Sequence, residues 1–270
     1  MKLKLAYSPC PNDTFMFDAM IHHKVDTEGL EFEVQLHDVE ALNVMSFDSQ
    51  SDVTKISYNA FLHLHRKYAL LSSGSALGEK CGPLLIAKKD KVESFNPQSL
   101  VAIPGKYTTA NCLFSMAFPN NINTKEMLFS EIEDSVLNGE VDAGLIIHEN
   151  RFTYHEKCLE KVIDLGEYWQ EQTQLPIPLG CIVVSKLLDS SLQIKIQRVL
   201  RRSIEFALEF PKESLNYVKK HAQEMDIDIM KSHIQLYVNE YSLDLGDRGR
   251  DAVYYLFKKN GVSVNYLEII

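Results

Sequence analysis

Short apolar strands alternate with amphipathic helices over the first third of the chain, and this alternation restricts the fold more than any other feature. Leu3–Tyr7 is a short apolar run, and Leu30–Leu36 alternates apolar and polar residues as a half-buried strand does. Apolar residues within Phe15–His23 recur at helical spacing, and Asn12 or Asp13 is a natural N-cap for that helix. The repeated order of strand and helix predicts an α/β fold in which helices cover a parallel sheet.

The same layout occurs a second time and then gives way to helices. The expected strands of the second series are Leu100–Ile103, Met127–Phe129, Val141–Ile147, Lys161–Leu165 and Leu179–Val184. Four helices are expected after them, at Leu192–Phe210, Lys212–Gln223, Asp226–Val238 and Gly246–Lys259. We therefore predict a discontinuous first domain, residues 1–88 and 187–270, and a second domain, 89–186, inserted into it. Two crossings between these domains would form a hinge beside a cleft, which is a common position for a ligand.

Composition and charge exclude several classes of protein. The 270 residues are 45% hydrophobic, enough to bury a sizeable core, and the formal net charge is -9 with no long run of Lys or Arg. This balance argues against a nucleic-acid-binding or anionic-membrane surface. No segment has the apolar length of a membrane span, and the N-terminus lacks the pattern of a signal peptide. The five cysteines are scattered, which is typical of reduced thiols in a cytoplasmic protein.

His148 is the strongest candidate for a catalytic group. It comes directly after the expected buried strand Val141–Ile147, and ligands of open α/β sheets bind beyond the carboxyl ends of the strands. The alternative is a structural histidine bonded to a backbone carbonyl. We interpret the polar residues that follow it, Glu149, Asn150 and Arg151, mainly as the scaffold that fixes its position.

Three further polar segments follow predicted strands and can meet the histidine in the cleft. They are Ser8–Thr14, Lys55–Ser57 and Gly105–Ala110. At Lys55, Ile56 and Ser57 a strand ends and a helix begins, so free backbone N–H groups and the Ser57 hydroxyl form an anion site. Lys55 either adds its charge to that site or is a solvated surface lysine.

Thr108, Thr109 and Ala110 repeat this logic in the second domain, because hydroxyl groups again stand at a helix N-terminus. Ordinary Ser/Thr capping is the alternative for each of these segments. Ser8 and Asn12 are the polar groups of the first segment that could contact the same ligand. An acidic or hydroxyl-rich small molecule is the expected ligand.

The motifs indicate no metal or nucleotide cofactor. His63 and His65 are two residues apart on a predicted helix and so point in different directions. No spacing of carboxylates, cysteines and histidines gives a metal-binding set. The segment GKYTT lacks the P-loop pattern, and GxGxxG, GxSxG and HExxH are absent.

Four motifs are relevant to the function: SPCPNDTF (Ser8–Phe15), DVTKIS (Asp52–Ser57), GKYTTA (Gly105–Ala110) and IHENRFTY (Ile147–Tyr154). In residues and spacing they resemble the 1,4-dihydroxy-6-naphthoate synthase family of the futalosine route to menaquinone. The resemblance runs over nearly the whole chain. SPCPNDTF and HENRFTY carry most of its specificity, whereas KIS and TTA are weak signals alone.

The resemblance implies an α/β, two-domain periplasmic-binding-protein-like fold with a hinge and an interdomain cleft. It implies a lyase that converts cyclic dehypoxanthine futalosine to 1,4-dihydroxy-6-naphthoate, with release of the sugar-derived fragment and without a cofactor. The family's proton acceptor falls on His148, and its substrate contacts fall on Lys55–Ser57 and Thr109–Ala110. Thr108, Ser8 and Asn12 complete the predicted substrate-binding set.

Two other functions stay open at this point. One is a passive binding protein for a small acid, and the other is the sister enzyme chorismate dehydratase, which shares the fold. The absence of a signal peptide argues against an exported receptor, and the two specific motifs favour the naphthoate synthase. The expected partner is a small molecule, with neither nucleic acid nor membrane. The apolar C-terminus, NYLEII, suggests either a homodimer interface or docking within the chain.

Overall fold

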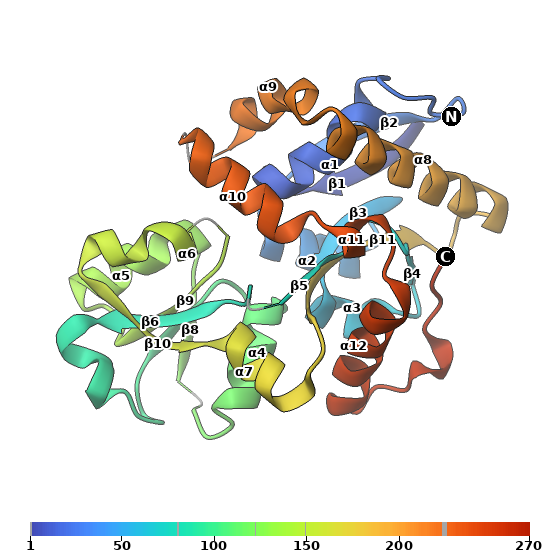
Figure 1. Ribbon diagram of the computed structural model, residues 1–270. Helices are drawn as coiled ribbons and strands as arrows, with labels where there is room; N and C mark the ends of the chain where they lie inside the picture. Colours follow the sequence, from blue (N-terminus) through green and yellow to red (C-terminus); the bar gives the residue numbers. More distant parts are fainter. Residues whose placement is uncertain (1, 80, 122, 149, 223–225) are drawn as a thin grey trace. The chain divides into compact units, whose positions relative to one another are not determined.

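The computed structural model describes residues 2–79, 81–121, 123–148, 150–222 and 226–270. The chain divides into two compact units (Figure 1): unit 1 comprises Met1–Gly78 with Pro178–Ile270, and unit 2 comprises Glu79–Ile177. Each unit is built around a sheet of its own. Within the described ranges, no helix combines the length and the apolar character that crossing a bilayer requires.

The sheet of unit 1 combines early strands of the chain with one late strand. Its strands are β1 (Lys2–Tyr7), β2 (Glu31–Leu36), β3 (Val53–Ser57), β4 (Tyr68–Leu70), β5 (Ala76–Gly78) and β11 (Ile177–Ser185). Their order is β2-β1-β3-β11-β4, and β5 pairs with β11. β1 runs parallel to β2 and β3, whereas β11 runs antiparallel to β3 and β4. The sheet is therefore mixed rather than parallel throughout, because the strand that returns to it runs in the opposite direction.

Unit 1 takes its helices from both ends of the chain. They are α1 (Pro11–Ile21), α2 (Val39–Phe47), α3 (Tyr58–Leu64), α8 (Ser190–Glu209), α9 (Pro211–His221), α10 (Ile227–Tyr237), α11 (Glu240–Leu243) and α12 (Gly246–Lys259). α1 packs against α8, α9 and α10, and Figure 1 shows α8 and α9 alongside it. The Ser203 hydroxyl of α8 joins the two helices, because it accepts a hydrogen bond from Met20 N (3.0 Å) and donates one to Met16 O (2.7 Å). The N-terminal and C-terminal parts of unit 1 thus share one core.

Helix α1 begins earlier than predicted. Cys10 stands at the N-cap and Pro11 occupies the first turn. Proline suits that position because its φ is already helical and the N–H that it lacks would have no partner in the helix. The prediction of Asn12 or Asp13 as the N-cap was therefore wrong. Asp13 lies inside the first turn, where it is 2% exposed.

The C-terminal residues dock on unit 1. Ile270 N donates to Leu70 O (2.9 Å), Leu70 N donates to Glu268 O (2.9 Å), and Ser72 N donates to Ile270 O (2.8 Å). The side chain of Ile270 packs against the core of unit 1. Docking within the chain, one of the two interpretations of the apolar tail, is therefore what the structure has.

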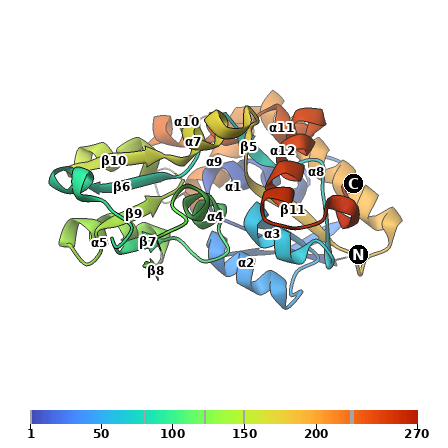
Figure 2. The ribbon, with the colours of Figure 1, turned by 90° about the horizontal axis from the view of Figure 1, so that it is seen from below.

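Unit 2 contains a five-stranded sheet in the order β10-β6-β9-β7-β8, which the labels of Figure 2 follow from top to bottom. Its strands are β6 (Leu84–Lys88), β7 (Val101–Ile103), β8 (Thr124–Glu126), β9 (Ala143–Ile146) and β10 (Leu159–Asp164). Its helices are α4 (Thr109–Ala117), α5 (Ile132–Asn138), α6 (Asn150–Thr153) and α7 (Leu165–Thr173). β7 runs parallel to β8 and β9, and β6 runs antiparallel to β9 and β10. The predicted strand Met127–Phe129 was wrong, since Phe129 begins a 3-10 helix, Phe129–Glu131, just after β8.

The boundaries between the units lie one strand earlier than predicted. The prediction placed residues up to 88 in the first domain and residues up to 186 in the second. In the structure β6 pairs with β9 and β10 of unit 2, and β11 pairs with β3 and β4 of unit 1. Both strands are apolar runs, and an apolar run alone does not indicate which sheet accepts it.

Candidate functional site

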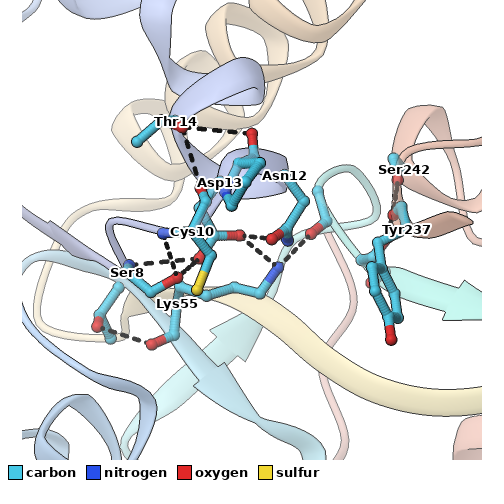
Figure 3. A network of polar contacts seen from close by, with 12 residues as sticks. Ser8, Cys10, Asn12, Asp13, Thr14, Lys55, Tyr237 and Ser242 are labelled. Carbon is cyan, nitrogen blue, oxygen red and sulfur yellow. Dashed lines mark hydrogen bonds and ion pairs between the residues drawn. The ribbon is translucent and has the colours of Figure 1, made fainter. Parts of the chain in front are cut away.

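Asp13 is the centre of a buried polar network in unit 1 (Figure 3). Its Oδ2 accepts a hydrogen bond from the Ser8 hydroxyl (2.7 Å), and its Oδ1 accepts one from Asn12 Nδ2 (2.9 Å). Lys55 Nζ lies 3.1 Å from the same Oδ1. All four side chains are buried. Ser8, Asn12 and Lys55 were predicted as separate substrate-binding groups, and the structure brings them together around Asp13.

Lys55 reaches this network from within the sheet of unit 1. Its strand, β3, is buried at all five positions and pairs with β1 on one side and β11 on the other. Lys55 Nζ also donates to Gly74 O (3.4 Å). A Cβ at Gly180 of β11 would lie 3.1 Å from Lys55 Cε, so the glycine leaves room for the lysine side chain. Lys55 is therefore not a solvated surface lysine, and its buried ammonium requires a partner such as Asp13.

Ser57 ends β3 and stands at the N-cap of α3, but its side chain does not cap that helix. Asn43 of α2 binds it twice, because Ser57 N donates to Asn43 Oδ1 (2.9 Å) and Asn43 Nδ2 donates to Ser57 Oγ (3.1 Å). Asn43 Nδ2 is also 2.9 Å from Glu40 Oε2. Asn43 thus fixes the orientation of the Ser57 hydroxyl. The adjacent Ile56 is fully buried and pairs with Cys181 on β11, so its side chain belongs to the core.

The predicted binding segment of unit 2 lies at the start of α4. Thr108 is the N-cap of this helix, and its hydroxyl accepts a hydrogen bond from Asn111 N (3.3 Å) and donates one to Gly105 O (2.7 Å). Capping, the alternative considered for this segment, is therefore one role that Thr108 has. Gly105 has a φ of +143°, a region that side chains rarely adopt. Thr109 and Ala110 are buried in the first turn of α4.

His148 lies just beyond the carboxyl end of β9, as predicted, although the strand itself ends at Ile146. Its backbone is left-handed, with a φ of 58°, a conformation that few residues other than glycine adopt. The imidazole is half-buried and meets the Phe129 ring edge to face, with the ring centroids 5.0 Å apart. Glu149, which follows it, lies outside the described residues. His148 and Thr108–Ala110 belong to unit 2, and the Asp13 network belongs to unit 1.

Burial keeps several other ionisable groups near these residues neutral. Burial, together with the neighbouring Tyr217 hydroxyl at 2.7 Å, raises the pKa of Tyr7. Burial also raises the pKa of the Cys181 thiol, although the charge of Lys55 opposes this shift. In unit 2, burial raises the pKa of the Cys81 thiol to about 12. None of these three groups is ionised near neutral pH, so none is a ready nucleophile or base.

Sequence reasoning missed the partners of the predicted residues rather than the residues themselves. Asp13 was interpreted as a cap, and Asn43 and Gly180 were not singled out. One signal could have found Asp13: a lysine within an apolar strand needs a buried acid, and Asp13 is the acid of the neighbouring polar segment. Asn43 and Gly180 carry no such signal, because their contacts depend on how distant elements pack.

Free thiols and the absence of a metal cluster characterise the described part of the chain. All five cysteines are free, and Cys158 is exposed while the other four are buried. Among the residues described by the structure, no group of three or more His, Cys, Asp or Glu side chains is placed to hold a metal ion.

Comparisons with known proteins relate the chain to one family and one fold. A family model described as menaquinone biosynthesis matches residues 3–260. A 1,4-dihydroxy-6-naphtoate synthase of Thermus thermophilus is 41% identical over 257 residues, which span 94% of this chain and 92% of that protein. A crystal structure of an Archaeoglobus fulgidus protein matches with a TM-score of 0.89 and 38% identity, covering 96% of this chain and 98% of its own.

A more distant structural match carries the name of the fold. A Candida albicans gene product with the generic periplasmic binding protein fold matches with a TM-score of 0.71 and 13% identity, over 100% of this chain and 96% of its own. Identity at this level concerns the fold alone. The predicted α/β, periplasmic-binding-protein-like architecture is thus confirmed, with two mixed sheets.

Proposed function

We propose that this chain, which belongs to the menaquinone biosynthesis family, is a lyase that converts cyclic dehypoxanthine futalosine to 1,4-dihydroxy-6-naphthoate. The observation that carries the proposal is its 41% identity to a 1,4-dihydroxy-6-naphtoate synthase over 94% of this chain and 92% of the relative. A match over both chains, and not over a single motif, extends to the elements that position the candidate site. The fold alone would not decide the matter, since similar folds serve unrelated functions.

His148 is the proposed base that removes the proton with which carbon–carbon cleavage begins. Its place just beyond β9 supports this role, because ligands of α/β sheets bind beyond the carboxyl ends of strands. An imidazole can accept a proton near neutral pH, and its half-buried position against Phe129 restricts where it does so. The product is aromatic, so the fragmentation itself supplies driving force, and one base with suitable polar groups is sufficient chemistry.

Each unit has polar groups that are proposed to bind the substrate. An ammonium group has three N–H donors, and Lys55 uses two of them on Asp13 Oδ1 and Gly74 O. The third is available to a substrate oxygen. Ser57, oriented by Asn43, offers a hydroxyl, and Ser8 and Asn12 belong to the same network. In unit 2, the first turn of α4 at Thr108, Thr109 and Ala110 offers the positive end of a helix dipole to a carboxylate.

The test is product formation. The purified chain is incubated with cyclic dehypoxanthine futalosine and, in a separate reaction, with chorismate, and the products are followed by mass spectrometry. We expect 1,4-dihydroxy-6-naphthoate and the sugar-derived fragment from the first reaction, and unchanged chorismate in the second. Turnover of chorismate alone would assign the chain to the sister reaction, and binding without product in either reaction would indicate a passive binding protein.

The role of His148 is tested separately by His148→Gln, which keeps a hydrogen-bonding group of similar length but cannot accept the proton. We expect a loss of kcat of about 100-fold or more, the range for removal of a general base. A variant that turns the substrate over at the wild-type rate would show that another group is the base. As the control for folding, the variant should unfold at the melting temperature of the wild type.

A further inference from the structure

Three strands of unit 2 bring Ile146, Leu84 and Asp164 into one row across the sheet. Leu84 of β6 is in register with Ile146 of β9 on one side and with Asp164 of β10 on the other. Both neighbours run antiparallel to β6. The carboxyl ends of β9 and β10 and the amino end of β6 therefore lie at the same edge of the sheet. His148, two residues beyond Ile146, is at this edge.

Arg151 returns across that edge to the other two strands. One guanidinium nitrogen donates to Gly82 O, just before β6, and another lies 3.0 Å from Asp164 Oδ2 at the end of β10. The two side chains of this ion pair are 15% and 5% exposed. A partly buried, two-point guanidinium contact of this kind fixes direction as well as distance.

Asp164 is itself held in place. Its Oδ1 accepts hydrogen bonds from Gly166 N (2.7 Å) and Glu167 N (3.2 Å), which caps α7. Gly82 and Gly166 are in close backbone contact, because a Cβ at Gly82 would lie 2.2 Å from Gly166 N. The two groups that bind Arg151 thus belong to one rigid junction of β6, β10 and α7.

The backbone of His148 needs such support. A left-handed conformation at a residue other than glycine persists only where its surroundings determine it. The pairing of β9 with β6 fixes the chain two residues before His148, and the contacts of Arg151 fix it three residues after.

We infer that Arg151 and Asp164 are positioning residues that hold His148 in its working place, an inference that rests on the proposed role of His148 as the base. They act through the course of the chain and do not touch the reacting atoms. An ion pair that only stabilised the fold would lower the melting temperature when removed and leave the imidazole of the folded protein where it was. Removal of a positioning pair would shift the imidazole.

Kinetics give the first test, with Arg151→Lys and Asp164→Asn. Lysine keeps the charge but cannot reach both acceptors with a planar fork, and asparagine keeps an oxygen for the α7 cap but loses the charge. We expect kcat to fall about 10- to 100-fold, as for a catalytic group displaced by about 1 Å, while KM changes less than about threefold. The double variant should lose no more than the more damaging single variant, because both changes break one contact.

The second test detects the position of the His148 imidazole by NMR and does not depend on catalytic activity. The Phe129 ring lies 5.0 Å from the imidazole, so its ring current shifts the His148 proton resonances in an NMR spectrum. The His148 signal, one of nine histidine signals, is the one absent from the His148→Gln spectrum. We expect this signal to move in Arg151→Lys and in Asp164→Asn. Lys161→Gln is the matched control, because Lys161 also joins β10 to α7, but through Glu167 at 3.5 Å.

The two tests separate this inference from the proposed function. Folded variants with wild-type kcat and an unmoved His148 signal would overturn the inference, as would Lys161→Gln shifting that signal as strongly. If the wild-type chain forms no dihydroxynaphthoate, the proposed function fails, and the NMR signal alone decides whether Arg151 and Asp164 hold His148. Either single variant suffices should the other fail to fold.

Discussion

Lys55 Nζ lies 3.1 Å from Asp13 Oδ1, and the two side chains are 8% and 2% exposed. The pair connects the middle of the sheet of unit 1 to the first turn of α1. Because Ser8 and Asn12 also bind the Asp13 carboxylate, its negative charge is shared among several donors. Lys55 is thereby fixed in direction, and its charge is largely balanced. A substrate oxygen at Lys55 would therefore meet an oriented donor rather than an unpaired cation.

Asp13→Asn should destabilise unit 1, because it leaves the buried Lys55 ammonium without a counter-charge. Removal of one partner of a buried ion pair costs about 3–5 kcal/mol in free energy of unfolding. Urea unfolding followed by circular dichroism measures the change. The double variant Asp13→Asn with Lys55→Met, which removes both charges, should recover much of the loss. Equal stability of wild type and Asp13→Asn would mean that the pair is not what holds Lys55.

Gly180→Ala should disturb substrate binding with a smaller effect on the fold. Its Cβ would lie 3.1 Å from Lys55 Cε and 3.3 Å from Ile56 O, which is tighter than ordinary contact, so the lysine side chain must shift. Overpacking of this kind costs about 1–3 kcal/mol. If about 1 kcal/mol of this cost is lost from the free energy of substrate binding, KM rises about fivefold. Steady-state kinetics measure it, and an unchanged KM would show that Lys55 does not contact the substrate.

Glu28→Gln should make unit 1 less sensitive to acid. Hydrogen bonds from the Arg198 and Arg202 guanidinium groups lower the pKa of Glu28 from 4.5 to about 2. A carboxyl with a depressed pKa in the folded state stabilises the fold fully above the unfolded value, near 4.5, and loses this contribution as the pH falls towards 2. Between pH 5 and pH 2.5 the melting temperature of the variant should therefore fall less steeply than that of the wild type. Glu31→Gln, at an exposed position on β2, is the control and should keep the wild-type slope.

Deletion of Glu268–Ile270 should destabilise unit 1. The deletion removes three backbone hydrogen bonds to Leu70 and Ser72 and the partly buried Ile270 side chain. At about 1 kcal/mol for each hydrogen bond, the loss is about 3 kcal/mol before the apolar contact is counted. Thermal unfolding measures it. Ile270→Ser, which keeps the backbone bonds, should have the smaller effect, and a deletion without effect would mean that the docked tail contributes nothing.

Local pattern was sufficient to predict the elements but not their partners. The helix Gly246–Lys259 was predicted with the bounds that the structure gives, because glycine and apolar periodicity mark it within its own residues. His148 was correctly placed beyond a strand for a similar reason. The sheets to which β6 and β11 belong were predicted wrongly, since strand pairing depends on residues far away in the chain.

The candidate site divides in the same way. Its chemical groups are visible in the sequence, because lysine, serine and histidine at strand ends stand out from apolar runs. The residues that hold these groups in place are harder to recognise in the sequence. Asp13, Asn43 and Asp164 contact residues that only the fold brings near. The role of Asp13 could be inferred only from Lys55, a lysine within an apolar strand that needs a buried acid, because Asp13 itself has the pattern of a helix cap.

The place of β11 between β3 and β4 also sets an order of events during synthesis. β4 ends at Leu70, and β11 begins only at Ile177, after the whole of unit 2 has been made. At ribosomal rates of about 5–20 residues per second, β3 and β4 wait on the order of 5–20 s for the strand that joins them. Unit 2 is continuous and can complete its sheet in that interval, while β3 keeps one unpaired edge. Nascent chains stalled before Ile177 should therefore be the species in which the newborn protein most needs a chaperone.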